Sequence, residues 1–158
     1  MNIIKVLGIA AGVAVAGLAG LAITNPGNAA ETSNDGKDES LQTRRYRVDF
    51  KTFVEETEKL IPTLTTYGQS WKLIGSGGGG GGTVGGNESQ NHSATFIIEV
   101  PVAFFTDDLE INANKVAGKD ELTVNVRSSS RLGKSDLGEN RRHVLQILEA
   151  LDTKFAGK

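Results

Sequence analysis

Three segments between Ala94 and Val126 alternate apolar and polar residues, and this alternation constrains the fold more than any other feature of the chain. The apolar positions are Ala94, Phe96, Ile98, Val100, Val102 and Phe104, then Leu109, Ile111 and Ala113, then Leu122, Val124 and Val126. Because successive side chains of a strand point to opposite faces, each segment predicts a strand with one buried face. The short links between the segments predict an antiparallel meander.

Two amphipathic helices are predicted beside these strands. Asp49 is positioned to cap the first, whose apolar stripe is Phe50, Phe53, Val54, Leu60 and Ile61. The second is predicted to begin near Ser135 or Asp136, with Asp136 and Glu139 spaced as a capping box. Its apolar stripe is Leu137, Val144, Leu145, Leu148 and Leu151, extended by Phe155.

Two further strands are predicted, at Leu41–Val48 before the first helix and at Trp71–Ile74 after it. The predicted order is therefore β-α-β-β-β-β-α. Since each helix has one apolar face, both must pack on the same face of the sheet. The predicted fold class is α+β, a two-layer sandwich of an antiparallel sheet with both helices on one face and the other face uncovered.

Residues 1–30 have the layout of a secretory signal peptide. Lys5 precedes the apolar run Val6–Ile23, and Pro26 and small residues follow it. A run of about 18 apolar residues can also span a bilayer, so an N-terminal membrane anchor is the alternative. The polar residues 31–40 predict a disordered tether. Residues 41–158 are predicted to form a single α+β domain, with a flexible glycine-rich loop at residues 75–86.

The composition excludes several classes of function. The chain has no cysteine, which removes disulfides and thiol chemistry, and its net charge of −2 is a poor match for nucleic acid. The Gly133-Lys134-Ser135 sequence imitates the end of a phosphate loop, but Ser128 stands where that pattern needs glycine. His92 and His143 are predicted to be ordinary surface residues, and Trp71 and Tyr67 to be core residues.

Arginine is concentrated near the last strand and the last helix, and this concentration predicts the functional surface. If the preceding hairpin turns about Ala117 and Gly118, Asp108 faces Arg127 across the strands. Arg131 and Arg141 could join them, with Ser128 and Ser130 as further donors. One interpretation is an anion-binding site, since guanidinium groups suit carboxylate or phosphate. The other is an ion-pair network that holds the last helix on the sheet. Asp107 and Asp108 lack the further oxygen ligands that calcium needs, so neither a metal nor a cofactor is predicted.

The motifs FTDDLEI and VRSSSRLGKSDLGENRRHV resemble the signature of the domain of unknown function 1499 family, and LQTRRY resembles its first strand. Many members carry a cysteine-containing segment before that strand, which this chain lacks. The resemblance implies an exported or membrane-tethered protein of bacterial or plastid type, so the expected location is extracytoplasmic, in a periplasm or thylakoid lumen. The family has no settled activity. The resemblance and the charge pattern together predict these ligand- or partner-binding residues: Arg44, Asp107, Asp108, Arg127, Ser128, Ser130, Arg131, Asp136, Asn140 and Arg141.

The function predicted from these features is that of an exported accessory or binding domain without enzymatic activity. Its ligand is expected to be an anionic small molecule, a lipid head group or a partner protein. The alternative is a hydrolase-like enzyme in which Asp107 or Asp108 acts as the base and arginines hold a charged substrate. A pocket with a titratable group of perturbed pKa would favour the enzyme.

Overall fold

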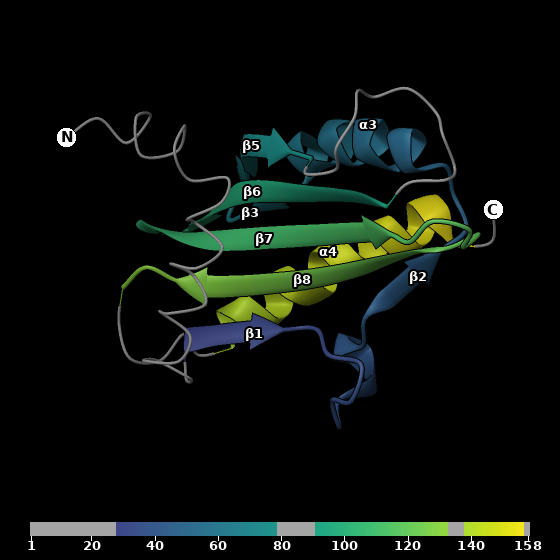
Figure 1. Ribbon diagram of the computed structural model, residues 1–158. Coiled ribbons are helices and arrows are strands. Elements are labelled where there is room, and N and C mark those ends of the chain that lie inside the picture. The colour runs from purple at the N-terminus through teal and green to yellow at the C-terminus, as the bar shows by residue number, and fades with distance from the viewer. Residues whose placement is uncertain (1–27, 79–90, 133–137, 157–158) are drawn as a thin grey trace.

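Six strands form one antiparallel sheet, and four of them follow one another in the chain as a meander. These are β5 (Lys72–Gly77), β6 (His92–Val102), β7 (Phe105–Lys115) and β8 (Leu122–Ser130), which lie side by side in that order (Figure 1). The computed structural model describes residues 28–78, 91–132 and 138–156. The predicted meander is confirmed, because the alternation of apolar residues gives β6, β7 and β8 one buried face each. The predicted place of Phe104 on that buried face is wrong, because β6 ends at Val102 and Phe104 is 97% exposed in the turn that follows.

Two short strands extend the sheet along the free edge of β8. β1 (Ala29–Glu31) pairs with residues 127–129 and β2 (Arg44–Tyr46) with residues 122–124, both antiparallel. Between them lies the short 3-10 helix η2 (Glu39–Leu41). Thr32 continues the contact of β1, because its backbone N–H donates to the carbonyl of Val126 at 2.9 Å and its Oγ1 accepts from the backbone N–H of Val126 at 2.9 Å.

Residues 31–40 therefore belong to the fold, contrary to the predicted disordered tether. Backbone and hydroxyl hydrogen bonds mainly hold this segment in place, and such contacts do not require the apolar periodicity by which a strand is predicted. The ordered domain begins by Asn28, which is buried, and not near Leu41. Residues 1–27 of the predicted leader lie outside the described residues, and its last three are part of the domain. No helix in the described ranges has both the length and the apolar character needed to cross a bilayer.

The first helix, α3 (Phe50–Leu60), begins as predicted. The Asp49 side chain accepts a hydrogen bond from the backbone N–H of Thr52 at 2.9 Å and so caps the helix. The last helix, α4 (Glu139–Phe155), begins later than predicted. Its N-cap is Gly138, with a φ of +84°, so Glu139 occupies the first helical position and the predicted capping box is wrong. Asp136 lies outside the described residues.

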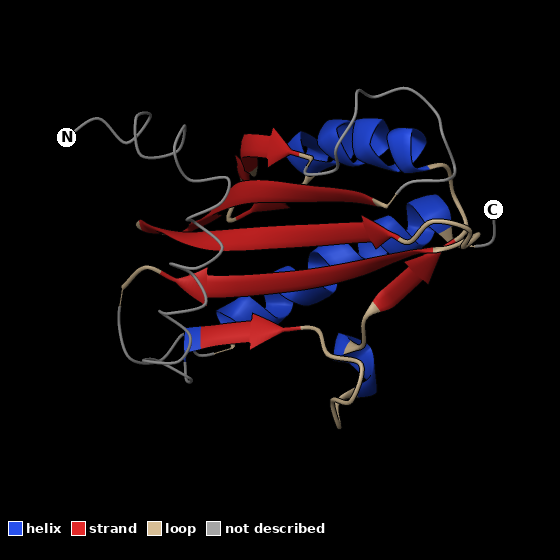
Figure 2. Cartoon of the chain, viewed as in Figure 1, coloured by secondary structure: helices blue, strands red, loops and turns tan. Residues whose placement is uncertain are grey.

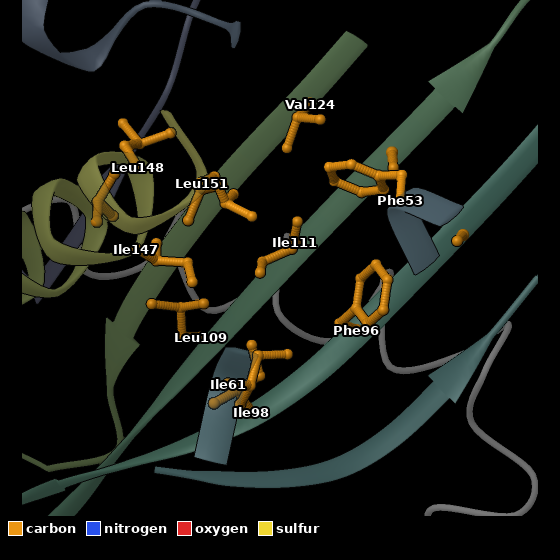
Figure 3. Packing of buried hydrophobic residues seen from close by; sticks show 14 of the residues in the cluster. Phe53, Ile61, Phe96, Ile98, Leu109, Ile111, Val124, Ile147, Leu148 and Leu151 are labelled. Carbon is orange, nitrogen blue, oxygen red and sulfur yellow. The ribbon is translucent and has the colours of Figure 1, made fainter. Parts of the chain in front are cut away.

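Both helices pack on the same face of the sheet, which confirms the predicted two-layer sandwich (Figures 1 and 2). The ring of Phe53 from α3 lies 6.4 Å from that of Phe96 on β6 and 4.9 Å from that of Phe155 at the end of α4. Ile147, Leu148 and Leu151 of α4 face the strands in the same core (Figure 3). The other face of the sheet is covered by neither helix.

The β7–β8 register differs by two residues from the prediction. Val116 to Lys119 form a turn, closed by a 3.1 Å hydrogen bond from the Lys119 N–H to the Val116 carbonyl, and Gly118 has a φ of +72°. Asp120 and Glu121 follow before β8 begins, which lengthens the loop. As a result Arg127 lies opposite Glu110, and Asp108 lies opposite Ser129. The predicted pairing of Asp108 with Arg127 is wrong.

Smaller differences occur at the other loops. The 3-10 helix η3 (Ile61–Thr63) ends α3, and the hairpin of β3 (Thr65–Thr66) and β4 (Gln69–Ser70) follows it. Trp71 is buried as predicted, whereas Tyr67 lies at the hairpin turn and is 58% exposed. Strand β5 extends to Gly77, so the first part of the predicted glycine-rich loop is strand. Residues 79–86 of that loop lie outside the described part of the chain.

Candidate binding site

The uncovered face of the sheet carries three rows of mainly polar residues that run across the strands. One row contains Thr95, Asn112 and Asn125, the next contains Ile97, Glu110, Arg127 and Glu31, and the third contains Glu99, Asp108, Ser129 and Ala29. These positions alternate with the buried apolar residues of the same strands. The face opposite the helices is therefore built mainly from hydrogen-bonding and charged groups.

A pocket of about 210 Å³ opens on this face beside β1 and β8. It is lined by Glu31, Thr32, Glu110, Asn112, Asn125, Val126 and Arg127. Hydrogen bonds among these residues, and from Thr95 and Thr43 beside them, hold the polar walls in place. Asn112 donates to Glu110 and accepts from Thr95 at 2.8 Å. The Oδ1 of Asn125 accepts from the hydroxyls of Thr32 at 3.1 Å and Thr43 at 2.6 Å.

Arg127 is the exceptional residue of this pocket. Its side chain is 17% exposed, and its Nε and Nη2 atoms are buried without a hydrogen-bond partner. The Oε2 of Glu31 lies 3.9 Å from Nε, which is an ion pair without a hydrogen bond. A buried donor without an acceptor costs about 1–3 kcal/mol, and more when it is charged. A bound acceptor would remove this cost.

Arg131 lies on the same face but is already paired. Its Nη2 lies 2.6 Å from Asp108 Oδ1 and 2.8 Å from Glu99 Oε1, and its Nε donates to both oxygens of Asp108 at 3.0 Å. The hydrogen bonds that Arg131 donates to Asp108 raise the pKa of Arg131 above its ordinary value, and the hydrogen bond to Glu99 adds to this. This ion-pair network links the end of β8 to β7 and β6, and unlike the predicted alternative it does not include the last helix.

Asn140, Ser128 and Ser130 form a largely buried network on the opposite, helix-covered face. The Oδ1 of Asn140 accepts from Ser128 Oγ at 2.7 Å. Its Nδ2 donates to the carbonyl of Asn28 and to Ser130 Oγ, both at 2.8 Å. Asn140 is fully buried, so this one side chain joins α4 to β8 and to the start of β1. Ser128 and Asn140 are therefore buried between the helix and the sheet, and Ser130 is partly buried beside them.

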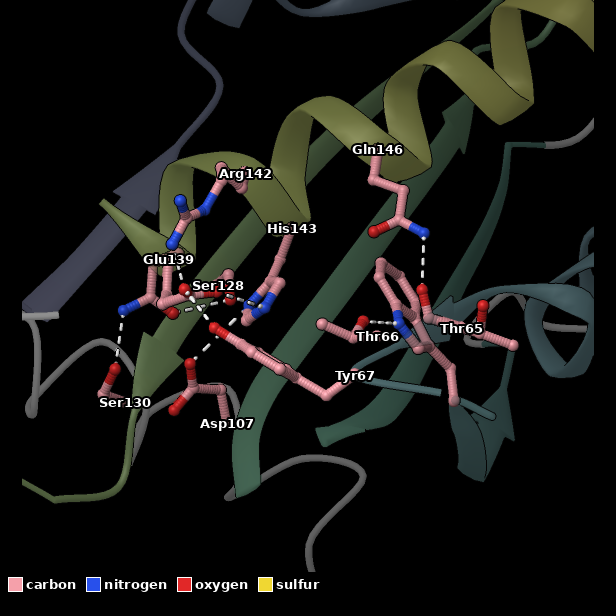
Figure 4. A network of polar contacts seen from close by, with 12 residues as sticks. Thr65, Thr66, Tyr67, Asp107, Ser128, Ser130, Glu139, Arg142, His143 and Gln146 are labelled. Atoms are coloured by element: carbon pink, nitrogen blue, oxygen red, sulfur yellow. Dashed lines mark hydrogen bonds and ion pairs between the residues drawn. The ribbon is translucent and has the colours of Figure 1, made fainter. Parts of the chain in front are cut away.

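Asp107 and His143 form a second buried pair on that face, between α4 and β7 (Figure 4). His143 Nδ1 lies 3.6 Å from Asp107 Oδ2, and Nε2 lies 3.5 Å from Glu139 Oε2. The Tyr67 hydroxyl donates to Glu139 at 2.7 Å, and this hydrogen bond raises the pKa of Tyr67. His143 is 1% exposed, so its prediction as a surface residue is wrong. It lies one helical turn before Ile147, and this spacing could have revealed its burial.

The remaining predicted residues lie elsewhere. Arg44 pairs with Asp152 of α4 at 3.0 Å, and Tyr46 donates to the same carboxylate at 2.8 Å. Arg141 pairs with Asp38 at 2.9 Å on the surface beside η2. Asp136 lies outside the described residues. The structure therefore divides the predicted arginine-rich cluster among separate contacts and leaves Arg127 as the arginine that lines the pocket.

Asp107 and Asp108 also point to opposite faces, because they are neighbours in one strand. One site therefore cannot use both as predicted. Among the residues that the structure describes, no group of three or more His, Asp or Glu side chains is arranged to hold a metal ion.

Several pocket residues were not predicted from the sequence. Glu110, Asn112 and Asn125 alternate with the apolar residues of β7 and β8, and that alternation alone places them on the uncovered face. Glu31 and Thr32 reach the pocket only because β1 pairs with β8. The sequence offered no signal for that pairing.

Fold and site together define a two-layer α+β domain with a helix-covered apolar face and an uncovered polar face. Residues 22–151 match the family described as protein of unknown function, DUF1499, and the chain belongs to that family. The match includes all the described strands and both major helices except the last turn of α4. Neither a curated protein nor a solved structure matches the chain.

Proposed function

We propose that the protein is an exported binding domain without enzymatic activity, and that its ligand binds in the pocket around Arg127. The observation that supports this most strongly is the pair of buried guanidinium atoms without acceptors, Nε and Nη2. Guanidinium groups pair well with carboxylate and phosphate, often through two parallel hydrogen bonds. An anionic group at this position would supply the acceptors that Arg127 lacks.

The carboxylates of the pocket narrow the class of ligand. Glu110 lies directly across from Arg127, and Glu31 lies on its other side. These groups repel an anion but accept hydrogen bonds from hydroxyl or ammonium groups. The best match is a small molecule that carries both a carboxylate or phosphate and such donors, for example a sugar acid or an amino acid. The volume of about 210 Å³ is small beside the roughly 300–1,000 Å³ of pockets for drug-sized ligands.

The proposed location is extracytoplasmic, in a periplasm or thylakoid lumen. The apolar run Val6–Ile23 with the residues around it supports export, by either a cleaved signal or a retained anchor. The acidic net charge is a poor match for a nucleic-acid ligand, whose phosphates bind mainly to Lys and Arg. A lipid head group presents the same phosphate chemistry as a free phosphate ester, so soluble and vesicle-bound probes must be compared.

The test is ligand-dependent thermal stability of the full chain in detergent, with sodium phosphate, glutamate and gluconate as soluble probes and phosphatidylglycerol vesicles as the lipid probe. At about 100 times the dissociation constant a ligand stabilises the folded state by roughly 2.7 kcal/mol, which raises the midpoint by about 5 °C or more. Arg127→Gln should abolish this rise. Arg45→Gln is the matched control, because Arg45 is an exposed arginine that pairs with Glu121 away from the pocket. An unchanged rise in Arg127→Gln, or no rise with any probe in the parent protein, would refute the proposal.

A further inference from the structure

Four large apolar side chains are exposed at one end of the sandwich. Phe104 is 97% exposed and Phe105 57% exposed at the β6–β7 turn, Leu132 is 67% exposed just after β8, and Tyr67 is 58% exposed at the β3–β4 turn. Single exposed apolar residues are ordinary on a protein surface, but their concentration at one place marks a contact surface. We refer to Tyr67, Phe104, Phe105 and Leu132 as the apolar end.

The strand register and helix contacts bring these residues to the same end. Asp107, two residues after Phe105, lies opposite Ser130, two residues before Leu132. Tyr67 reaches this end through its hydrogen bond to Glu139, the first residue of α4. In Figure 1 this is the left-hand end, toward which the arrow of β8 points. Val116, the other large exposed apolar residue, lies on the β7–β8 loop at the opposite end.

The β6–β7 turn does not need this composition for its own stability. Ala103 adopts a left-handed conformation with a φ of +47°, which asparagine or glycine adopts at lower cost. The next residue, Phe104, projects almost entirely into solvent. Neither side chain improves the turn, so the exposed phenylalanine calls for an explanation outside the fold.

The described chain begins at the same end. Ala29 lies opposite Ser129, so Asn28 lies beside the last residues of β8, and its carbonyl accepts from the buried Asn140. Five residue steps separate Asn28 from Ile23, the end of the apolar run. At about 3.6 Å per step these five span at most about 18 Å. An anchor at Val6–Ile23 would therefore hold this end close to the membrane surface.

We propose that the apolar end rests on the bilayer that anchors the protein, with Phe104, Phe105 and Leu132 inserted among the lipids. The inference rests on the anchored form of the protein and is independent of the Arg127 ligand. Aromatic residues favour the membrane interface, and Tyr67 has both an apolar ring and a polar hydroxyl. The nearby arginines are already paired, Arg131 with Asp108 and Arg142 with Glu139. Apolar insertion, and not attraction to anionic lipid, is therefore the expected source of binding.

The test uses the full chain with one added fluorescent tryptophan, placed in one variant at the apolar end and in another at the opposite end of the sandwich. Trp71 is 1% exposed and serves as the unquenched background. Phe104→Trp and the matched control Val116→Trp are each reconstituted into phosphatidylcholine vesicles with or without brominated acyl chains. We expect the vesicles to carry the protein on flotation, and bromine to quench the added tryptophan at 104 at least fivefold more than that at 116.

Leu132→Trp gives an independent reading at the apolar end, which keeps the test decisive if the variant at 104 folds poorly. Equal quenching at both ends, or no quenching at 104 and 132, would overturn the proposed orientation. A further outcome is that brominated lipid does not quench the tryptophan while aqueous iodide cannot reach it. The apolar end would then contact a protein partner or a second copy of this chain instead of the bilayer. Failure of the chain to float with vesicles would overturn the anchored form itself.

Discussion

Asn140 shows how one buried polar side chain can decide the stability of this domain. Its amide satisfies Ser128 and Ser130 of β8 and the carbonyl of Asn28, with no exposure to solvent. Its removal would take away the hydrogen bonds of the buried Ser128 hydroxyl, the Ser130 hydroxyl and the Asn28 carbonyl. Arg141, the next residue, makes its ion pair with Asp38 on the surface, where both side chains are nearly half exposed.

Asn140→Ala should lower the free energy of unfolding by about 2–4 kcal/mol, since each buried group left unpaired costs roughly 1–3 kcal/mol. Arg141→Ala should lower it by less than about 1 kcal/mol, as is usual for exposed ion pairs. Urea denaturation of both variants measures the difference. Similar losses in the two would contradict the structural role assigned to Asn140.

Arg127 and its neighbours show which parts of the candidate site are readable from sequence. Alternation within a strand separates Asp107 from Asp108 and Arg127 from Ser128, although a motif groups them together. The lack of a hydrogen-bond acceptor at Arg127 Nε and Nη2, in contrast, is not readable from the sequence. It depends on where Glu31 lies, 96 positions earlier in the chain, and on a register that the extra loop residues Asp120 and Glu121 determine.

Among the strands and helices, β1 is the element whose place in the fold the sequence predicts least well. The meander and the helix stripes follow from local periodicity, which the sequence displays directly. β1 has three residues and is held on β8 mainly by hydrogen bonds. Such contacts leave no pattern of apolar residues, so a polar segment such as residues 31–40 reads as disordered even where it is part of a sheet.

Thr32→Val tests whether this segment is docked. Thr32 Oγ1 accepts from the backbone N–H of Val126, and valine would leave that buried donor unpaired at a cost of about 1–3 kcal/mol. Thr43→Val is the matched control, because the Thr43 hydroxyl donates only to Asn125, which keeps its bond from Thr32. Denaturation should show the larger loss for Thr32→Val. The opposite order would mean that residues 28–32 contribute little to the fold.

Glu56 connects the two helices at the surface of their shared layer. Its carboxylate lies 2.6 Å from Lys154 of α4 and 2.9 Å from Lys59 of α3. The hydrogen bond from Lys154, with that from Lys59, lowers the pKa of Glu56 to about 2. Because the folded pKa lies below the unfolded value of about 4.3, this stabilisation is present above that pH and is lost as pH falls toward 2.

The stability of the parent protein should therefore fall more steeply between pH 5 and pH 2.5 than that of Glu56→Gln. Glu55→Gln is the control, since Glu55 pairs only within its own helix, with Lys51 at 3.7 Å. The urea midpoint at the two pH values measures each slope, and added salt should reduce the difference. Parallel slopes in all three proteins would contradict the role assigned to Glu56.

Across the molecule, the two faces of the sheet differ in what they carry. The helix-covered face holds the aromatic and aliphatic core together with the Asn140 network and the Asp107–His143 pair. The uncovered face holds the pocket and the polar rows beside it. A ligand bound on the uncovered face need not disturb the core, which is the expected arrangement for a binding domain on a rigid scaffold.

We propose that Arg127, and no other arginine of the described residues, contacts the ligand. The most direct measurement is proton–nitrogen NMR of the arginine Nε–H groups in the full chain during titration with phosphate, glutamate and gluconate. We predict that the Arg127 signal moves with the best of these ligands while the signals of Arg44 and Arg131, held by Asp152 and Asp108, stay in place. Movement of the Arg131 or Arg141 signal with a stationary Arg127 signal would refute the binding site proposed at Arg127.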